Sequence, residues 1–222
     1  MQKNFILTSC GLSILTNLSK DYDFKKNIYN YSNKTEKEFT KDDLKYFNNF
    51  IEKIRNDLIT PNTEGLEKVS AELNALIKFY KQPLKDFDKN DIHFLLHTDT
   101  YLGKKTAEII QYILNNSSIN NVQLYGKSYL RTSNVFEFRL ALSCIAKEIS
   151  RYIIDYKKSG YRIIFNLTGG FKGINSFLQG MAYLYADEII YIFETSNELL
   201  RIPKLPIKID TKVIEDNISR NF

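Results

Sequence analysis

The stretch from Tyr161 to Lys172, which reads YRIIFNLTGGFK, has the residue types of a phosphate-binding turn. Its apolar first half is typical of a buried parallel strand, and residues 174–185 have the length and apolar content of a helix. Between them, Gly169 and Gly170 let the backbone approach a ligand closely. The start of the helix offers unpaired N–H groups, and Lys172 adds a full positive charge, so the turn suits a phosphate.

The same residues also fit an ordinary turn between a strand and a helix, with glycines that relieve strain and a solvated lysine. The chain has neither Gly-x4-Gly-Lys-Ser/Thr, the signature of ATP-binding loops, nor Gly-x-Gly-x-x-Gly, the signature of dinucleotide-binding turns. ATP hydrolysis and dinucleotide binding are therefore disfavoured. The residue types alone leave both interpretations of the turn open.

Two more polar clusters follow predicted strands. Residues 5–10 read as the first strand, which ends in the Ser-Cys-Gly-Leu-Ser segment 9–13. Residues 92–96 read as the second strand, and the His-Thr-Asp-Thr segment 97–100 follows it. The carboxyl ends of parallel strands face one edge of a sheet, so we expect both clusters to lie beside residues 166–172. Hydroxyls, backbone amides, a carboxylate and lysines at one edge would form a site for a polyanion.

The two histidines of the chain are His93 and His97, four residues apart, and on a strand they share one face. Two imidazoles without a third ligand make a poor zinc site, so we expect no metal. We expect His97 to hydrogen-bond loop backbone or a ligand. A Ser-His-Asp hydrolase could be assembled from Ser13, His97 and Asp99, but no Gly-x-Ser-x-Gly elbow is present, which disfavours that reaction.

Strands alternate with helices along the chain, which predicts an α/β fold: a Rossmann-like, mostly parallel sheet flanked by helices. We expect a C-terminal hairpin or extended pair from residues 199–202 and 207–209. The other predicted strands are 121–125 and 188–193, and the other predicted helices begin at residue 14 or span 40–58, 66–80, 103–114 and 136–154.

Two segments receive more specific predictions. Residues 21–40 are polar, rich in Lys, Asn, Tyr and Ser, and are predicted to form a loop inserted into the fold. Residues 66–80 carry one apolar stripe and are predicted to form one helix. We expect Glu72 to be a helix-edge carboxylate with its head in water, and a capping or site role is the alternative.

Composition bounds the class of protein. The 222 residues include 31 basic and 26 acidic side chains, a net charge of +5 that permits an anionic partner. No dense basic stripe is visible, so long nucleic acid is not expected. No apolar stretch approaches the ~20 residues of a membrane span, and Cys10 and Cys144 do not make a disulfide scaffold. We expect one cytoplasmic domain over residues 1–222, with the insert at about 21–40 and a C-terminal extension at 203–222.

Five segments together resemble a known family. Residues 165–172, FNLTGGFK, resemble the Asn-x-Thr-Gly-Gly-x-Lys motif of CRISPR-associated Rossmann-fold (CARF) domains of type III CRISPR systems. Residues 12–17, LSILTN, after Gly11 are similar to the family's Gly-Thr-Ser-Leu-Leu-Thr-Asn, with Leu12 where Thr is usual. Similar segments follow in the same order at 70–73, 96–100 and 205–207, and the 21–40 insert is longer than the family leads us to expect.

The resemblance implies a homodimer that binds a cyclic oligoadenylate, with cyclic tetra-adenylate the first choice, across its two-fold axis. The ring phosphates would lie over the paired turns that contain Gly169 and Gly170. The ligand-binding residues implied by the resemblance are Ser9, Cys10, Gly11, His97, Thr98, Asp99, Asn166, Thr168, Gly169, Gly170 and Phe171.

Two functions are compatible with this resemblance. The first is a ring nuclease without metal or cofactor, in which a ribose 2′-hydroxyl attacks its neighbouring phosphorus and leaves a 2′,3′-cyclic phosphate. By the match, Ser13 would position the ribose or phosphate and Lys172 would stabilise the developing charge. The second is a non-catalytic sensor or sponge that signals to a separate effector.

Different features favour each function. The Arg-x4–6-His pattern of the associated ribonuclease is absent, and the chain ends about a dozen residues past Asp210, which we expect to leave no room for an effector domain. That favours the nuclease. Leu12, and the lack of an obvious acid–base pair, favour the sensor.

Overall fold

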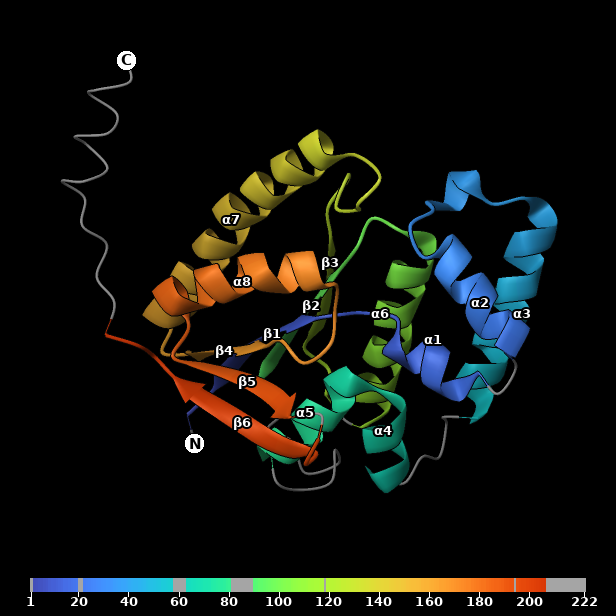
Figure 1. Cartoon of the computed structure of the whole chain (residues 1–222). Coiled ribbons are helices and arrows are strands. Elements are labelled where there is room, and N and C mark those ends of the chain that lie inside the picture. The colour runs from blue at the N-terminus through green and yellow to red at the C-terminus, as the bar shows by residue number, and fades with distance from the viewer. Residues whose placement is uncertain are drawn as a thin grey trace, which may run out of the picture.

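A six-stranded sheet lies between two layers of helices in the computed structural model of the chain (Figure 1). The structure describes residues 2–19, 22–57, 63–80, 90–117, 119–193 and 195–206. The strands are β1 Asn4–Ser9, β2 Ile92–His97, β3 Val122–Gly126, β4 Arg162–Asn166, β5 Glu188–Phe193 and β6 Glu198–Pro203. The helices are α1 Ser13–Leu18, α2 Tyr22–Tyr31, the short 3₁₀ helix η1 Glu36–Glu38, α3 Lys41–Asp57, α4 Thr63–Val69, α5 Ala71–Tyr80, α6 Tyr101–Asn116, α7 Val135–Lys158 and α8 Lys172–Tyr185.

The strand order is β3-β2-β1-β4-β5-β6, and the first five strands in this order are parallel. This confirms the predicted Rossmann-like α/β class. β6 runs antiparallel to β5, with Ile202 opposite Ile189, so the chain does carry a C-terminal extended pair. The partner of residues 199–202 is therefore β5, and the proposed partner 207–209 lies outside the described residues. The order reverses between β1 and β4, and ligands of open α/β sheets bind beside such a switch point.

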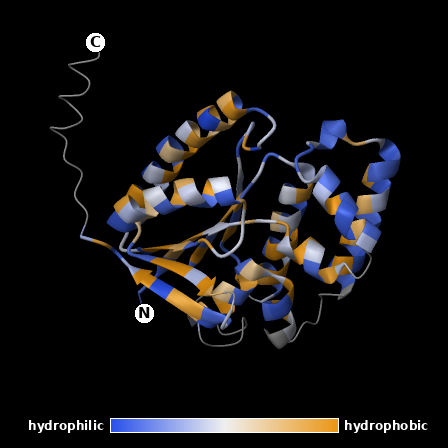
Figure 2. Cartoon of the chain, viewed as in Figure 1, coloured by the Kyte–Doolittle hydropathy of each residue, from blue (hydrophilic) through white to orange (hydrophobic). Residues whose placement is uncertain are grey.

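The central strands β1, β2 and β4 are buried on both faces, which explains their continuous apolar runs. Phe5 and Leu7 of β1 pack with the layer formed by α7 and α8, whereas Ile6 packs with helices of the opposite layer. Figure 2 shows that the helices beside the sheet carry both hydrophobic and hydrophilic residues. Within the described residues no helix combines the length and the apolar character that a membrane span requires.

The prediction that residues 21–40 form a loop is wrong, because they contain α2 and η1. Phe24 and Ile28, one helical turn apart, are buried, and the Phe24 ring lies 5.6 Å from that of Phe47 on α3. Tyr31, the last residue of α2, also packs its ring 5.3 Å from that of Phe47, so a few apolar and aromatic side chains dock a mostly polar helix. Tyr101, the first residue of α6, donates its amide to the carbonyl of Lys34, which ties the end of this segment to the sheet edge.

The prediction of one helix over residues 66–80 is also wrong. The helix is interrupted at Ser70, which lies between α4 and α5. Ser70 caps the start of α5, because its hydroxyl accepts the Leu73 amide at 3.2 Å. The other helices agree with prediction to within a few residues, and Leu58, the predicted end of α3, lies outside the described residues.

Candidate functional site

The carboxyl edge of the sheet brings together the three polar clusters expected from the sequence. The loop after β1 touches the turn after β4 so closely that a Cβ atom on Gly11 would lie 2.8 Å from the Gly170 nitrogen. The loop after β2 joins them, since its Thr98 and Thr100 line one hollow together with Gly11 and Gly170. These loops surround the point where the strand order reverses, and we call this edge the rim.

Glu72, in the first turn of α5, organises the rim. Its side chain is fully buried, so the prediction that its head lies in water is wrong. Oε1 accepts the Gly11 amide at 2.7 Å, and Oε2 accepts the hydroxyls of Ser13 and Ser70, each at 2.8 Å. Burial of a carboxylate is costly unless hydrogen-bond donors surround it, as they do here. The interruption of the helix at Ser70 places Glu72 at the rim, because the new helix α5 begins there.

The two glycines of the turn after β4 are required by packing within the protein. A Cβ atom on Gly169 would lie 2.0 Å from Glu72 Oε1, so the carboxylate occupies the space that a side chain would need. Gly170 has a φ of +97°, and a Cβ atom there would lie 1.9 Å from the Ser9 hydroxyl. Asn175 fixes the turn further, since its amide group donates to the carbonyls of Leu167 and Gly169.

Ser13 and Lys172, the residues with predicted catalytic roles, lie in different surroundings. The Ser13 hydroxyl donates to Glu72 and accepts the Ala71 amide at 3.2 Å, so it joins the β1–α1 loop to α5. Lys172 is exposed at the first position of α8. Phe171, the residue before the helix, gives the first-turn amides no side-chain acceptor, which leaves them available to solvent or an anion.

Several predicted ligand-binding residues make hydrogen bonds within the protein that hold the turn after β4 in place. Asn166 is buried, donates to the Glu72 carbonyl at 3.1 Å and accepts the Thr168 amide at 3.3 Å. The Thr168 hydroxyl accepts the Ile192 amide at 3.1 Å. Together with Ser9 and Gly169, these residues line neither of the two hollows described below. They fix the turn after β4 to α5 and β5.

The titratable groups at the rim are perturbed by burial. Burial, and secondarily the charge of Glu72, raises the pKa of the Cys10 thiol well above its usual value, so Cys10 stays protonated and is not a nucleophile. Burial lowers the pKa of His97, whose Nδ1 lies 2.8 Å from the Thr98 carbonyl and therefore carries the proton. His97 is thus a neutral imidazole near pH 7. His93, on the same strand, is fully buried, and burial lowers its pKa to about 4.

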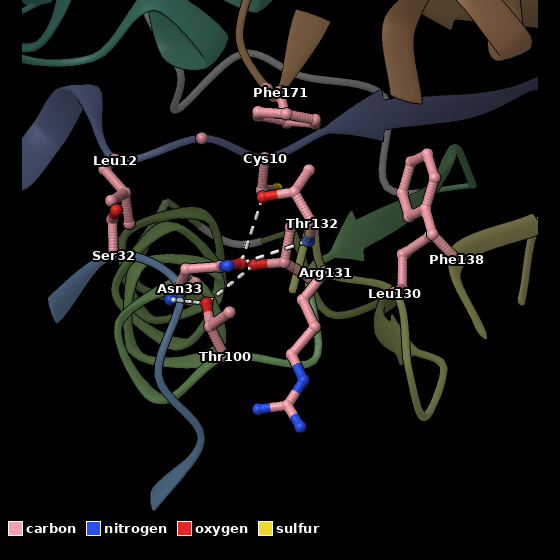
Figure 3. Close-up of a pocket in the computed structure, with 14 residues that line it drawn as sticks. Cys10, Leu12, Ser32, Asn33, Thr100, Leu130, Arg131, Thr132, Phe138 and Phe171 are labelled. Carbon is pink, nitrogen blue, oxygen red and sulfur yellow. Dashed lines mark hydrogen bonds between the residues drawn. The ribbon is translucent and has the colours of Figure 1, made fainter. Parts of the chain in front are cut away.

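Two adjoining hollows open at the rim. The inner hollow has a volume of about 180 Å³ and is lined by residues of the loops after β1, β2 and β4, among them Cys10, Gly11, Thr98, Gly170 and Phe171 (Figure 3). The outer hollow has a volume of about 740 Å³ and extends from the end of β2 along the first turns of α6. His97 and Asp99 line the outer hollow, and Thr98, Thr100 and Arg131 line both.

Sequence reasoning missed the contributions of the insert and of the β3–α7 loop. Ser32 and Asn33, just after α2, line the inner hollow, and Asn33 Oδ1 accepts the backbone amide of Thr132 at 3.1 Å and its hydroxyl at 3.3 Å (Figure 3). Arg131 in the same loop pairs with Glu38 at 2.5 Å. The helical spacing of Phe24 and Ile28 was the one available signal that this segment folds back on the protein.

A comparison with protein-family models gives a match over residues 67–205, more than half of the chain, to the family described as CRISPR-associated protein (Cas_APE2256). The matched range includes Glu72, the loop after β2 and the turn with Gly169 and Gly170, and it starts after Ser13 and the insert. No curated protein matches the chain.

We expect Glu72→Ala to lower the free energy of unfolding by about 2–5 kcal/mol, because three donors around a fully buried carboxylate lose their acceptor. The melting temperature should fall by about 5–15 °C in a thermal melt followed by circular dichroism. Glu72→Gln, which keeps one oxygen acceptor, should lose less.

Glu67→Ala is the matched control, since Glu67 pairs at 3.7 Å with Lys78 where both side chains are partly exposed. Such pairs contribute only ~0–1 kcal/mol. Equal melting temperatures for the Glu67 and Glu72 variants would contradict the role given to Glu72.

Proposed function

Since the chain belongs to the CRISPR-associated family Cas_APE2256, we propose that it binds a cyclic oligoadenylate at the rim, with cyclic tetra-adenylate the first choice. Family membership supports the resemblance to CARF domains of type III CRISPR systems. The observation that carries the proposal is the meeting of three loops at the switch point, with the uncapped start of α8 and Lys172 beside them. Backbone amides, a helix N-terminus and an ammonium group are what a chain of phosphates requires.

The charges around the hollows fit a polyanion. Lys37, Lys104, Lys105 and Arg131 line the outer hollow, against the two carboxylates of Glu36 and Asp99. Lys172 is exposed at the start of α8, on the same edge of the sheet. A concave surface with an excess of basic groups attracts and retains phosphates.

The surface beside the rim suits a second copy of the chain. The start of α7 exposes large apolar side chains, with Val135 73% and Phe136 69% exposed, and Leu140 and Phe171 are also exposed. Figure 2 shows hydrophobic residues at this end of the helix. Exposed apolar groups gathered at one place favour association. A homodimer formed through this end of α7 would face two rims toward one ring, and each copy would supply the same contacts.

We propose that the protein cleaves the ring by attack of a ribose 2′-oxygen on the adjacent phosphorus. The new O2′–P bond forms as the P–O5′ bond breaks, the 2′ proton passes to solvent, and the 5′ oxygen takes a proton from solvent. The products carry a 2′,3′-cyclic phosphate and a 5′-hydroxyl. Lys172 and the amides of the α8 start would stabilise the charge on the phosphoryl oxygens. Ser13, fixed by Glu72, would position the ribose or phosphate.

A second candidate is a sensor or sponge that binds the same ring without cleaving it. One observation favours it: the titratable groups at the rim offer no proton-transfer pair, since Cys10 stays protonated and His97 Nδ1 is held by the Thr98 carbonyl. Orientation and electrostatic stabilisation can nevertheless drive a slow reaction without a separate base. Turnover decides between the two candidates.

Purified protein in EDTA should convert cyclic tetra-adenylate to linear di-adenylate that ends in a cyclic phosphate, because the attacking and leaving oxygens belong to the ring itself. Liquid chromatography with mass spectrometry identifies the product. Intact ring after long incubation with excess protein would exclude the nuclease and leave the sensor.

Lys172→Ala should weaken binding of cyclic tetra-adenylate by about tenfold to a hundredfold, the effect of losing a charge-assisted contact to phosphate. Fluorescence anisotropy with a labelled ring measures the change. Lys158→Ala is the control, because it removes an exposed lysine at the C-terminal end of α7, whereas the dimer is proposed to form at the start of that helix. This variant should bind the ring as the unaltered protein does. If Lys172→Ala matches that control, the phosphate site has been misplaced.

A further inference from the structure

The two hollows differ in what they can hold. Sites for small molecules usually measure ~300–1,000 Å³, a range that includes the outer hollow at about 740 Å³ and excludes the inner hollow at about 180 Å³. A nucleotide therefore fits the outer hollow alone. Its lining includes Thr35, Glu36 and Lys37 around the start of η1, and Ser128, Tyr129 and Arg131 of the β3–α7 loop.

The β3–α7 loop holds Tyr129 in an unusual backbone conformation. Its φ is +68°, a left-handed value that costs energy for a residue other than glycine. The conformation is fixed from two sides, since Asp99 Oδ2 accepts the Tyr129 amide at 2.7 Å and the Tyr129 carbonyl accepts the Arg131 amide at 2.8 Å. Tyr129 is half exposed and lines the outer hollow. The strained loop thus places a tyrosine at the wall of the hollow.

Arg131, two residues after Tyr129, has a guanidinium group whose N–H donors are only partly used within the described residues. One of its five N–H groups, at Nη1, binds Glu38 Oε2, which also accepts the amide and the hydroxyl of Thr35. Arg131 Nε is buried and has no hydrogen-bond partner among the described residues. Figure 3 shows the side chain extending away from Asn33 and Thr132. A buried donor without a partner calls for an acceptor, which a water or a bound phosphate can supply.

We propose that the outer hollow is a nucleotide subsite, in which Arg131 binds a phosphate and the Tyr129 ring stacks on a nucleobase of the bound oligoadenylate. This inference rests on the function proposed for the rim. It also gives the insert a role: Glu38 and Asn33 hold the β3–α7 loop, so the insert positions both Arg131 and the stacking residue. Aromatic stacking accepts any nucleobase, so Tyr129 would not select adenine over the other bases. The bases stacked there are adenines because the proposed ligand contains no others.

Variants at Tyr129 separate stacking from loop structure. Tyr129→Leu removes the aromatic face and Tyr129→Phe keeps it, while both retain a side chain at the strained backbone position. Calorimetric titration with cyclic tetra-adenylate should show binding weakened by about tenfold in Tyr129→Leu and nearly unchanged in Tyr129→Phe. Tripolyphosphate, which has no base, should bind both variants as it binds the unaltered protein. Arg131→Gln should weaken binding of both probes.

Tyr29→Leu is the control, because Tyr29 is an exposed tyrosine of α2 that lines neither hollow. Ring binding by the unaltered protein together with unchanged binding in Tyr129→Leu would overturn the subsite and leave the proposed function standing. Equal losses for the ring and tripolyphosphate in Tyr129→Leu would show a structural role and also overturn it. If the unaltered protein binds no ring, the proposed function itself fails, and the subsite fails with it.

Discussion

The Glu72 carboxylate is the interaction on which the rest of the rim depends. It accepts the Gly11 amide, the Ser13 hydroxyl and the Ser70 hydroxyl, and it fills the space left by Gly169. A buried carboxylate is costly unless its donors are held in place, so the loops that supply them have little freedom. The loop after β1 and the turn after β4 are therefore fixed before any ligand arrives. Such preorganisation is what a binding or catalytic site for a charged ligand needs.

The parallel sheet positions the loops of the rim, and the insert that contains α2 and η1 contributes further residues to it. The parallel strands deliver their loops to one edge, and the reversal of order between β1 and β4 opens space there. The insert, with α2 and η1, folds back to the same edge and holds the β3–α7 loop through Asn33 and Glu38. Loops positioned by a rigid scaffold are where binding residues gather. The ligand that we propose, a cyclic oligoadenylate, follows from the resemblance to CARF domains, and the basic groups at the rim are of the kind that its phosphates require.

Sequence patterns predicted the parts of the structure that depend on neighbours along the chain. The apolar run of β2 and the glycine turn after β4 gave the fold and the edge at which the loops meet. The long-range contacts were not readable: Gly11 and Glu72 are 61 positions apart, and Glu38 and Arg131 are 93 apart. Glu72 was misplaced because its apolar neighbours suggested one unbroken helix, whereas Ser70 starts a new one. The insert was taken for a loop because its polar majority obscured two buried apolar residues.

We propose that two rims, each organised by its own Glu72, together hold one cyclic oligoadenylate. The stoichiometry of binding tests it most directly. Isothermal titration of the protein with cyclic tetra-adenylate should saturate at one ring for every two chains, since a two-fold axis passes through the ligand. Saturation at one ring for each chain would show that a single rim binds alone and would contradict the claim, as would a titration without any heat of binding.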